Sequence, residues 1–94
     1  MIISFRHKGL EKFFREGDGS KLPPQQLEKI RLILSVLDTA EDINDIRVPG
    51  FDLHKLVGKM AGLWAVKVNG NYRIVFDFNA AKIEVYDVNH MDYH

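Results

Sequence analysis

The chain has 94 residues, which is enough for one hydrophobic core, so residues 1–94 are expected to form a single domain. Its share of hydrophobic residues, 46%, is ordinary for a globular protein, and no run approaches the roughly 20 apolar residues that a membrane span requires. The absence of cysteine excludes disulfides and thiolate metal sites and favours a cytoplasmic location, and the formal net charge is zero.

The charges are distributed unevenly along the chain. Acids predominate from residue 38 to 52 and again after residue 76. Between them, residues 53–76 hold four basic side chains and no acid: Lys55, Lys59, Lys67 and Arg73. Such a basic segment is either a surface for a polyanion or a solvated face that happens to lack acids, and the charges alone leave both interpretations open.

The first half of the chain predicts a strand followed by two helices. Residues 2–5 are typical of a short strand, and apolar residues recur at helical spacing from His7 to about Arg15. A second helix of about four turns is expected to begin near Pro23 and Pro24, because proline is tolerated in a first helical turn. Its apolar stripe consists of Leu27, Ile30, Leu34 and Leu37, with Ile33 beside it. The acidic residues 38–52 are expected to form an irregular connection.

The last forty residues change to a period of two, which predicts strands. Alternating apolar residues mark the segments 64–68 and 72–78, and a third run extends from residue 82 to 88. Asn69-Gly70 between the first two runs predicts a type I′ hairpin, and a second turn is expected at residues 79–81. Strands joined by short turns are antiparallel neighbours. The expected fold is therefore α+β: an N-terminal strand, two helices and an antiparallel meander of about three strands, with the helices on one sheet face.

The alternation also predicts which side chains face away from the helices. If Tyr72 and the apolar residues that follow it at a spacing of two face the helices, then Arg73 points to the other side of the sheet. Lys67 lies across the hairpin from Arg73 and is expected to share that face. His54 and Lys55 enter the sheet from the acidic connection.

A histidine, an arginine and lysines near one phosphate suit a ribonuclease that needs no metal. When RNA is cleaved by its own 2′-hydroxyl, a base takes the hydroxyl proton, an acid protonates the departing 5′-oxygen, and fixed positive charge stabilises the phosphate. Histidine serves either proton role near neutral pH, and the arginine fork binds two phosphate oxygens. We expect no cofactor and no metal, because no histidine pair has the spacing of a zinc site. His7 and His90 are interpreted as structural.

Each of these residues also has a plain structural interpretation. A single histidine such as His54 is more often a loop residue than a catalyst, and Arg73 on a strand often pairs with an acid such as Asp77 or Asp87. Residues 93–94, at a chain end, are most often frayed. The residue types by themselves leave these alternatives open.

Five segments of the chain, taken together, resemble one family. They are the opening Met1–Leu10, the segment Phe51–Gly58 with its Leu-His-x-Leu-x-Gly pattern, Gly62–Val66, Asn71–Phe76 with Tyr-Arg-Ile, and the ending Asp92-Tyr93-His94. In this order and at this chain length they resemble the HigB branch of the RelE-like toxins of bacterial toxin–antitoxin systems. The resemblance covers essentially the whole chain; its motifs are specific as a set and weak singly.

The resemblance implies a RelE-like fold and a function. The family cleaves mRNA on the translating ribosome and is neutralised by an antitoxin, so the implied partners are a cognate HigA-like DNA-binding antitoxin, the ribosome and mRNA, and no membrane. The catalytic residues that it implies are His54, Arg73, Asp92, Tyr93 and His94, with Lys55, Lys59 and Lys67 as substrate-binding residues. In these roles His54 and His94 would transfer protons, Arg73 would clamp the phosphate, and Tyr93 would stack on a base.

The chain departs from the family pattern in two respects. Many relatives have a lysine where this chain has Val57, so either Lys55 or Lys59 is expected to supply the missing charge. Many relatives are strongly basic, whereas this chain is neutral, which predicts weaker attraction to RNA and a mild toxin. Two other functions remain open: a binding module of the same fold without catalysis, and a ParE-type relative that poisons DNA gyrase.

Overall fold

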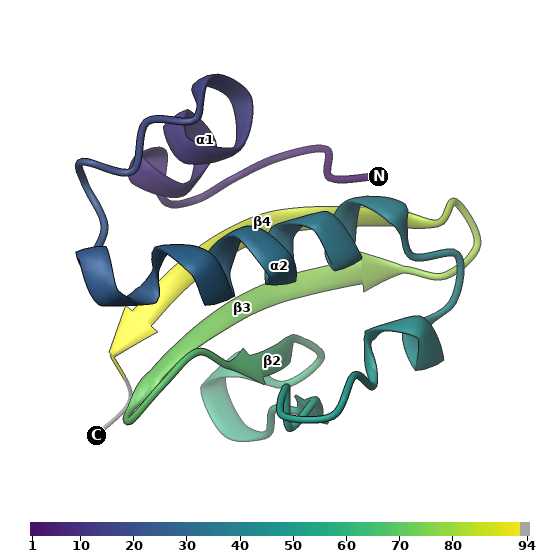
Figure 1. Cartoon of the computed structure of the whole chain (residues 1–94). Helices are drawn as coiled ribbons and strands as arrows, with labels where there is room; N and C mark the ends of the chain where they lie inside the picture. The colour runs from purple at the N-terminus through teal and green to yellow at the C-terminus, as the bar shows by residue number, and fades with distance from the viewer. Residues whose placement is uncertain (93–94) are drawn as a thin grey trace.

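The computed structural model describes residues 1–92, which form two α-helices and a four-stranded sheet. The elements are α1 (Lys8–Glu16), α2 (Leu27–Thr39), β1 (His54–Lys55), β2 (Trp64–Lys67), β3 (Tyr72–Asn79) and β4 (Glu84–Asp92), with short 3₁₀ turns at Pro24–Gln26, Ile43–Ile46 and Gly58–Met60. The strands follow the order β1-β2-β3-β4, and every neighbouring pair is antiparallel. In Figure 1, α2 lies across β3 and β4. The predicted α+β fold is confirmed.

Helix α1 is bounded by two local caps. At its start, the ring nitrogen Nδ1 of His7 accepts a hydrogen bond from the backbone N–H of Leu10 (3.1 Å). At its end, Gly17 adopts the left-handed conformation (φ 75°) and its N–H donates to the carbonyl of Phe13. Leu10 and Phe13 are buried, one helical turn apart. The helix therefore ends where the glycine-containing segment predicts.

Helix α2 begins later than the prolines suggest. The turn from Pro24 to Gln26 is 3₁₀, and regular α-helical hydrogen bonding starts at Leu27. The predicted apolar stripe is confirmed, because its members Ile30, Ile33, Leu34 and Leu37 are buried. None of the helices in residues 1–92 is long and apolar enough to cross a membrane.

The N-terminal strand is less regular than expected. Residues 2–5 run parallel to β4 but form only two isolated bridges, Ile2 with Val85 and Phe5 with Val88. The backbone N–H of Ile2 donates instead to the carboxylate of Asp38 at the end of α2 (3.0 Å). This segment nevertheless covers the edge of β4, so that edge is not open to solvent along its whole length.

The hairpin between β2 and β3 has a different turn from the predicted one. Gly70 has a positive φ (51°), but its neighbours Asn69 and Asn71 do not, so the turn is not type I′. The N–H of Tyr72 closes the turn by donating to the carbonyl of Asn69 (2.8 Å). The antiparallel register follows from this closure: Lys67 pairs with Arg73.

Strand β4 extends farther than its alternation predicts, because it contains a bulge. Between the pairs Asp77–Tyr86 and Val75–Asn89, β4 advances by three residues where β3 advances by two. Asp87 lies in this step with a positive φ of 55°, and its N–H donates to Ser4 Oγ (2.9 Å). The expectation that the strand ends at residue 88 is wrong; it continues to Asp92.

The sheet has a large core on its helix side and a small apolar cluster on the other side. The main core combines residues of both helices with inward residues of the strands, among them Val66, Ile74, Phe76, Val85 and Val88. The small cluster consists of Leu56, Ala65 and Val75, with Met60, Leu63 and Met91 packed against it. We call the face that carries this small cluster the outer face.

Candidate active site

The register of the sheet determines which side chains share the outer face. His54 is paired with Ala65, Ala65 with Val75, and Val75 with Asn89, so these four residues form one row across the four strands. The next row joins Lys67, Arg73 and Met91. Cross-strand partners project to the same side of a sheet. His54 and Arg73 therefore lie on one face, as the alternation predicts.

His54 is exposed, and its ring is oriented by its own chain. Its Nδ1 lies 2.9 Å from the carbonyl oxygen of Asp52, and a carbonyl only accepts, so in the neutral ring the proton lies on Nδ1. Asp52 presents this carbonyl from a left-handed conformation (φ 49°), which aspartate tolerates better than most residues. The second nitrogen of His54, Nε2, is thereby left with a lone pair that can accept a proton.

Arg73 is half-buried on β3, and its guanidinium contacts backbone carbonyls. Nη1 donates to the carbonyls of Gly70 (3.0 Å) and Tyr72 (3.1 Å), which hold the side chain toward the hairpin. The ion pairs that the structure gives between residues 1–92 do not include Arg73, so the pairing with Asp77 or Asp87 is not observed. Among the contacts described for residues 1–92, the guanidinium of Arg73 is held by backbone carbonyls.

The three predicted substrate-binding lysines do not share one position. Lys67 is exposed opposite Arg73 on the outer face. Lys59 lies in the 3₁₀ turn that follows β1, beside the outer face. Lys55 is paired with Trp64, and its ammonium lies 5.4 Å from the Trp64 ring centroid, on the side of the sheet opposite His54.

The outer face contains a groove of about 390 Å³. Its lining residues are Arg6, Lys59, Met60, Leu63, Val75, Asp87, Asn89 and Met91. We call it the catalytic-face groove. His54 and Arg73 do not line it; they flank it, His54 in the row of Val75 and Arg73 in the row of Met91.

The C-terminal part of the expected site is described only as far as Asp92. Asp92 is exposed, ends β4 and pairs in register with Tyr72, the residue before Arg73. Tyr93 and His94, which the resemblance assigns to the site, lie outside the described residues. The residues brought together on the outer face are therefore His54, Arg73, Lys59 and Lys67.

A polar network on the helix side supports the end of β4. Gln26 is buried; its amide Nε2 donates to Asn69 Oδ1 (3.0 Å), and its Oε1 accepts from His90 Nε2 (2.8 Å). The His90 ring stacks on Tyr72 (centroids 5.0 Å apart) and meets the His7 ring edge-on (5.6 Å). The contacts of His7 and His90 with one another, with Gln26 and with Tyr72 are consistent with the structural role that the sequence predicts for both histidines.

Burial changes the acid–base behaviour of the two histidines in this network. Desolvation lowers the pKa of His90, the nearby His7 lowers it further, and Asp92 opposes both effects. Desolvation also lowers the pKa of His7 below its ordinary value of 6.5. Both rings are thus kept neutral around pH 7, which suits the acceptor role of His7 at the start of α1.

Three residues of the catalytic-face groove escape prediction from the sequence. Asn89 and Met91 face outward only because of the bulge at Asp87, which shifts the alternation of β4. Arg6 joins the groove from the other end of the chain. No local pattern signals either effect: Asn89 and Met91 carry no charge that would single them out, and nothing in the sequence places Arg6 beside β4.

Known proteins resemble this chain over most or all of its length. Residues 3–94 match the family model of HigB-like toxins, described as the RelE-like toxin of the type II toxin–antitoxin system HigB. An endoribonuclease HigB of Proteus vulgaris is 38% identical over 94 residues, the whole of both chains. Toxin HigB-1 of Vibrio cholerae serotype O1 is 31% identical over 80 residues, which covers 83% of this chain and 84% of that protein. The chain therefore belongs to the HigB-like family of RelE-like toxins of type II toxin–antitoxin systems.

Proposed function

We propose that this toxin is an endoribonuclease that cleaves mRNA during translation without a metal. The observation that carries the proposal is the register of the sheet, in which His54 and Arg73 share the outer face and flank the catalytic-face groove. The relative from Proteus vulgaris, which aligns over the whole chain, is named an endoribonuclease. The groove gives the RNA backbone a place to lie between a proton acceptor and a fixed cation.

The reaction that fits these groups is cleavage by the neighbouring 2′-hydroxyl. His54 Nε2 accepts the proton of the 2′-hydroxyl while that oxygen attacks the phosphorus, and the bond from phosphorus to the 5′-oxygen breaks. A second proton carrier protonates the departing 5′-oxygen, the role proposed for His94. The products are a 2′,3′-cyclic phosphate and a free 5′-hydroxyl. The hydrogen bond from His54 Nδ1 to the Asp52 carbonyl supports this direction of proton transfer, because it leaves Nε2 unprotonated.

Arg73 is proposed to bind the scissile phosphate as negative charge accumulates on it. Two backbone carbonyls accept hydrogen bonds from its Nη1. The guanidinium is therefore already oriented, and it loses less conformational freedom when it binds the phosphate. Lys67, the cross-strand partner of Arg73, adds a second cation beside it. Asp92 and Tyr93 are proposed to complete the site, with Tyr93 stacking on an unpaired base.

Lys59 is the better candidate to replace the lysine that many relatives have at the position of Val57. Lys59 lines the catalytic-face groove, whereas the ammonium of Lys55 lies over Trp64 on the other side of the sheet. A cation must reach the phosphate to stabilise it, since an exposed charge is screened over a distance of about 8–10 Å. We therefore assign the supporting charge to Lys59, with Lys55 in a packing role.

We propose further that the toxin acts in the cytoplasm on ribosome-bound mRNA and is neutralised by a cognate HigA-like, DNA-binding antitoxin. Membership of a type II toxin–antitoxin family supports an antitoxin partner. Ribosome dependence rests on the family resemblance, because the neutral net charge weakens attraction to mRNA and to ribosomal RNA alike.

The decisive test is cleavage of a defined mRNA by purified toxin, with and without translating ribosomes. The wild type should cut only when ribosomes are present, and His54→Gln should lower the rate by about 100-fold or more while melting at the same temperature. Expression of the wild type should also slow bacterial growth, and co-expression of its antitoxin should relieve this. Intact mRNA with slowed growth and inhibited DNA supercoiling would favour a gyrase poison; intact mRNA with normal growth would favour a binding module.

A further inference from the structure

A second groove lies beside the catalytic-face groove, at the start of α1. Its volume is about 620 Å³, and its lining residues are Arg6, His7, Lys8, Gly9, Lys12, Lys21 and Asn89. Four of these seven residues are arginine or lysine, and none is acidic. We call it the basic groove. Such a concentration of positive charge, in a chain of zero net charge, suits an anionic ligand.

The basic residues converge because residues 6–9 and the loop that carries Lys21 meet at Gly9. A side chain at Gly9 would place its Cβ 2.7 Å from Lys21 Cβ and 2.8 Å from His7 Cε1, so only glycine permits this approach. Gly9 itself is buried in the first turn of α1. The loop that carries Lys21 is thereby packed against the helix start that carries Lys8.

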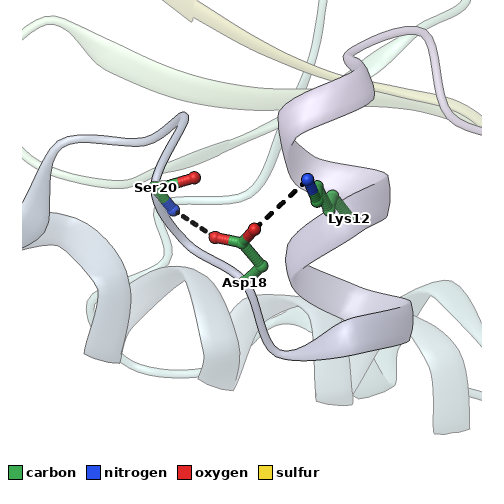
Figure 2. A network of polar contacts seen from close by, with 3 residues as sticks. All are labelled: Lys12, Asp18 and Ser20. Carbon is green, nitrogen blue, oxygen red and sulfur yellow. Dashed lines mark hydrogen bonds and ion pairs between the residues drawn. The ribbon is translucent and has the colours of Figure 1, made fainter.

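One of the four cations already has a partner in the protein. Figure 2 shows Asp18 between Lys12 and Ser20: its carboxylate lies 3.3 Å from Lys12 Nζ and accepts from the Ser20 N–H at 2.9 Å. The Ser20 hydrogen bonds and Lys12 lower the pKa of Asp18 to about 2, so Asp18 stays charged and compensates Lys12 near neutral pH. The ion pairs given for residues 1–92 include none of Arg6, Lys8 and Lys21, and these three carry the groove's net charge.

The basic groove is continuous with the catalytic-face groove. Arg6 and Asn89 line both. Arg6 reaches this position because its N–H and that of His7 donate to the Val88 carbonyl, which fixes the N-terminal segment along the edge of β4. The two grooves therefore meet at that edge, with Arg6 between them.

We propose that the basic groove binds the phosphodiester backbone of the RNA strand that continues out of the catalytic-face groove. This inference rests on the proposed ribonuclease function. An RNA strand that crosses the β4 edge at Arg6 meets Lys8 and Lys21 next. Lysine side chains that lie apart from one another can each bind one of the evenly spaced phosphates of such a strand, and these contacts do not depend on the base sequence. In this proposal the basic groove contributes affinity for RNA, whereas the residues of the outer face cleave it.

The test is the salt dependence of binding to a single-stranded, fully 2′-O-methylated RNA of about 12 nucleotides, which has no 2′-hydroxyl to react. The double variant Lys8→Gln/Lys21→Gln should lower the slope of log K against log salt by about 1.4, because each phosphate contact on a single strand contributes roughly 0.7. The matched control, Arg47→Gln/Lys82→Gln, removes the same charge from exposed residues outside both grooves and should leave the slope unchanged.

The outcomes separate this inference from the proposed function. Equal slopes for the groove variant and the wild type, with both variants melting normally, would overturn the basic groove as an RNA site; so would an equal loss in the control. Failure of the wild type to cleave any mRNA would overturn the ribonuclease proposal, while the binding slopes still test the groove.

Discussion

Arg73 illustrates how backbone carbonyls can orient a guanidinium group on a strand. Its guanidinium is held by two neutral carbonyls, Gly70 and Tyr72, on a strand whose next residue is fully buried. Neutral carbonyls orient the group without neutralising its charge. An aspartate in their place would neutralise it.

This geometry predicts a large functional effect and a small structural one. Arg73→Lys should lower the rate of mRNA cleavage by a factor on the order of 100–1,000, because a point charge cannot reproduce two parallel hydrogen bonds to phosphate. Arg73→Ala should be at least as severe. Cleavage rate and melting temperature are to be measured on the same samples. Full activity of Arg73→Ala would remove Arg73 from the site and weaken the ribonuclease proposal.

Val57 is the second residue with a sharp prediction. Its side chain is 85% exposed directly before the turn that carries Lys59, so a longer side chain meets no obstacle there. Val57→Lys should raise the rate of mRNA cleavage, because it adds a cation close to the turn that carries Lys59 and lines the catalytic-face groove. The free energy of unfolding should change by less than about 0.5 kcal/mol.

The matched control is Val57→Gln, which has similar reach and no charge. An increase that is equal in Val57→Lys and Val57→Gln would show that charge is not the cause. No increase in either would mean that Lys59 already supplies what the reaction needs.

Among the elements, β4 determines which C-terminal side chains reach the outer face. Without its bulge, Val85 and Asn89 would share a face, since they lie four positions apart on one strand. With the bulge at Asp87, Val85 and Val88 both lie in the main core and Asn89 turns outward. The same shift sets the register of Asp92 against Tyr72.

The bulge therefore predicts coupled losses of stability and activity. Asp87→Val places a β-branched residue at a φ of 55°, and it should destabilise the protein by about 1–3 kcal/mol. It should also lower the cleavage rate, because Asn89 and Met91 are displaced from the groove. Asp87→Gly removes the same carboxylate but accepts the conformation, so its activity should remain close to the wild type. Urea unfolding and cleavage assays of both variants test this; equal behaviour of the two would argue that the carboxylate, not the backbone, matters.

At the scale of the whole molecule, a single polar network joins distant parts of the chain. Gln26 lies at the start of α2, Asn69 in the hairpin, His90 on β4 and His7 before α1. The network closes only when these four segments are packed together. It requires neutral rings at both histidines, since His7 accepts from an N–H and His90 lies beside it.

Stability should therefore decrease as the pH falls below about 6.5. Both histidines have a pKa below 6.5 in the folded protein, so the unfolded chain binds protons first as the pH falls. This protonation lowers the free energy of the unfolded state relative to the folded state. The stabilisation is complete above pH 6.5 and is lost as the pH falls through the folded pKa values. Urea unfolding between pH 5 and pH 8 measures this.

The control for this prediction is His7→Asn. Asparagine preserves an acceptor at the start of α1 and does not titrate, so the pH dependence should become shallower while stability at pH 8 is retained. A pH dependence identical to the wild type would exclude His7 as a source of it.

The sequence by itself determined the class of fold and named the residues that are proposed for the site. Apolar spacing of 3.6 and then of 2 is a local property, and it predicted the two helices, the antiparallel meander and the outward direction of Arg73, which the structure confirms. The resemblance to HigB-like toxins supplied the roles of His54 and Arg73, and family membership is confirmed. Their catalytic roles stay predictions, as do those of Tyr93 and His94.

The tertiary structure alone decided how the two faces of the sheet are divided. The bulge at Asp87 depends on one backbone angle, which no alternation reveals, and it controls where Asn89 faces. Lys55 and Lys59 are basic residues of one segment, but they lie on different sides of the sheet. Lys55 lies over Trp64, whereas Lys59 belongs to the turn that follows β1 and lines the catalytic-face groove. The approach of Arg6 to Asn89 joins the two ends of the chain. Packing between distant segments determines such convergence. A sequence pattern shows only how apolar and polar residues alternate along neighbouring positions of the chain.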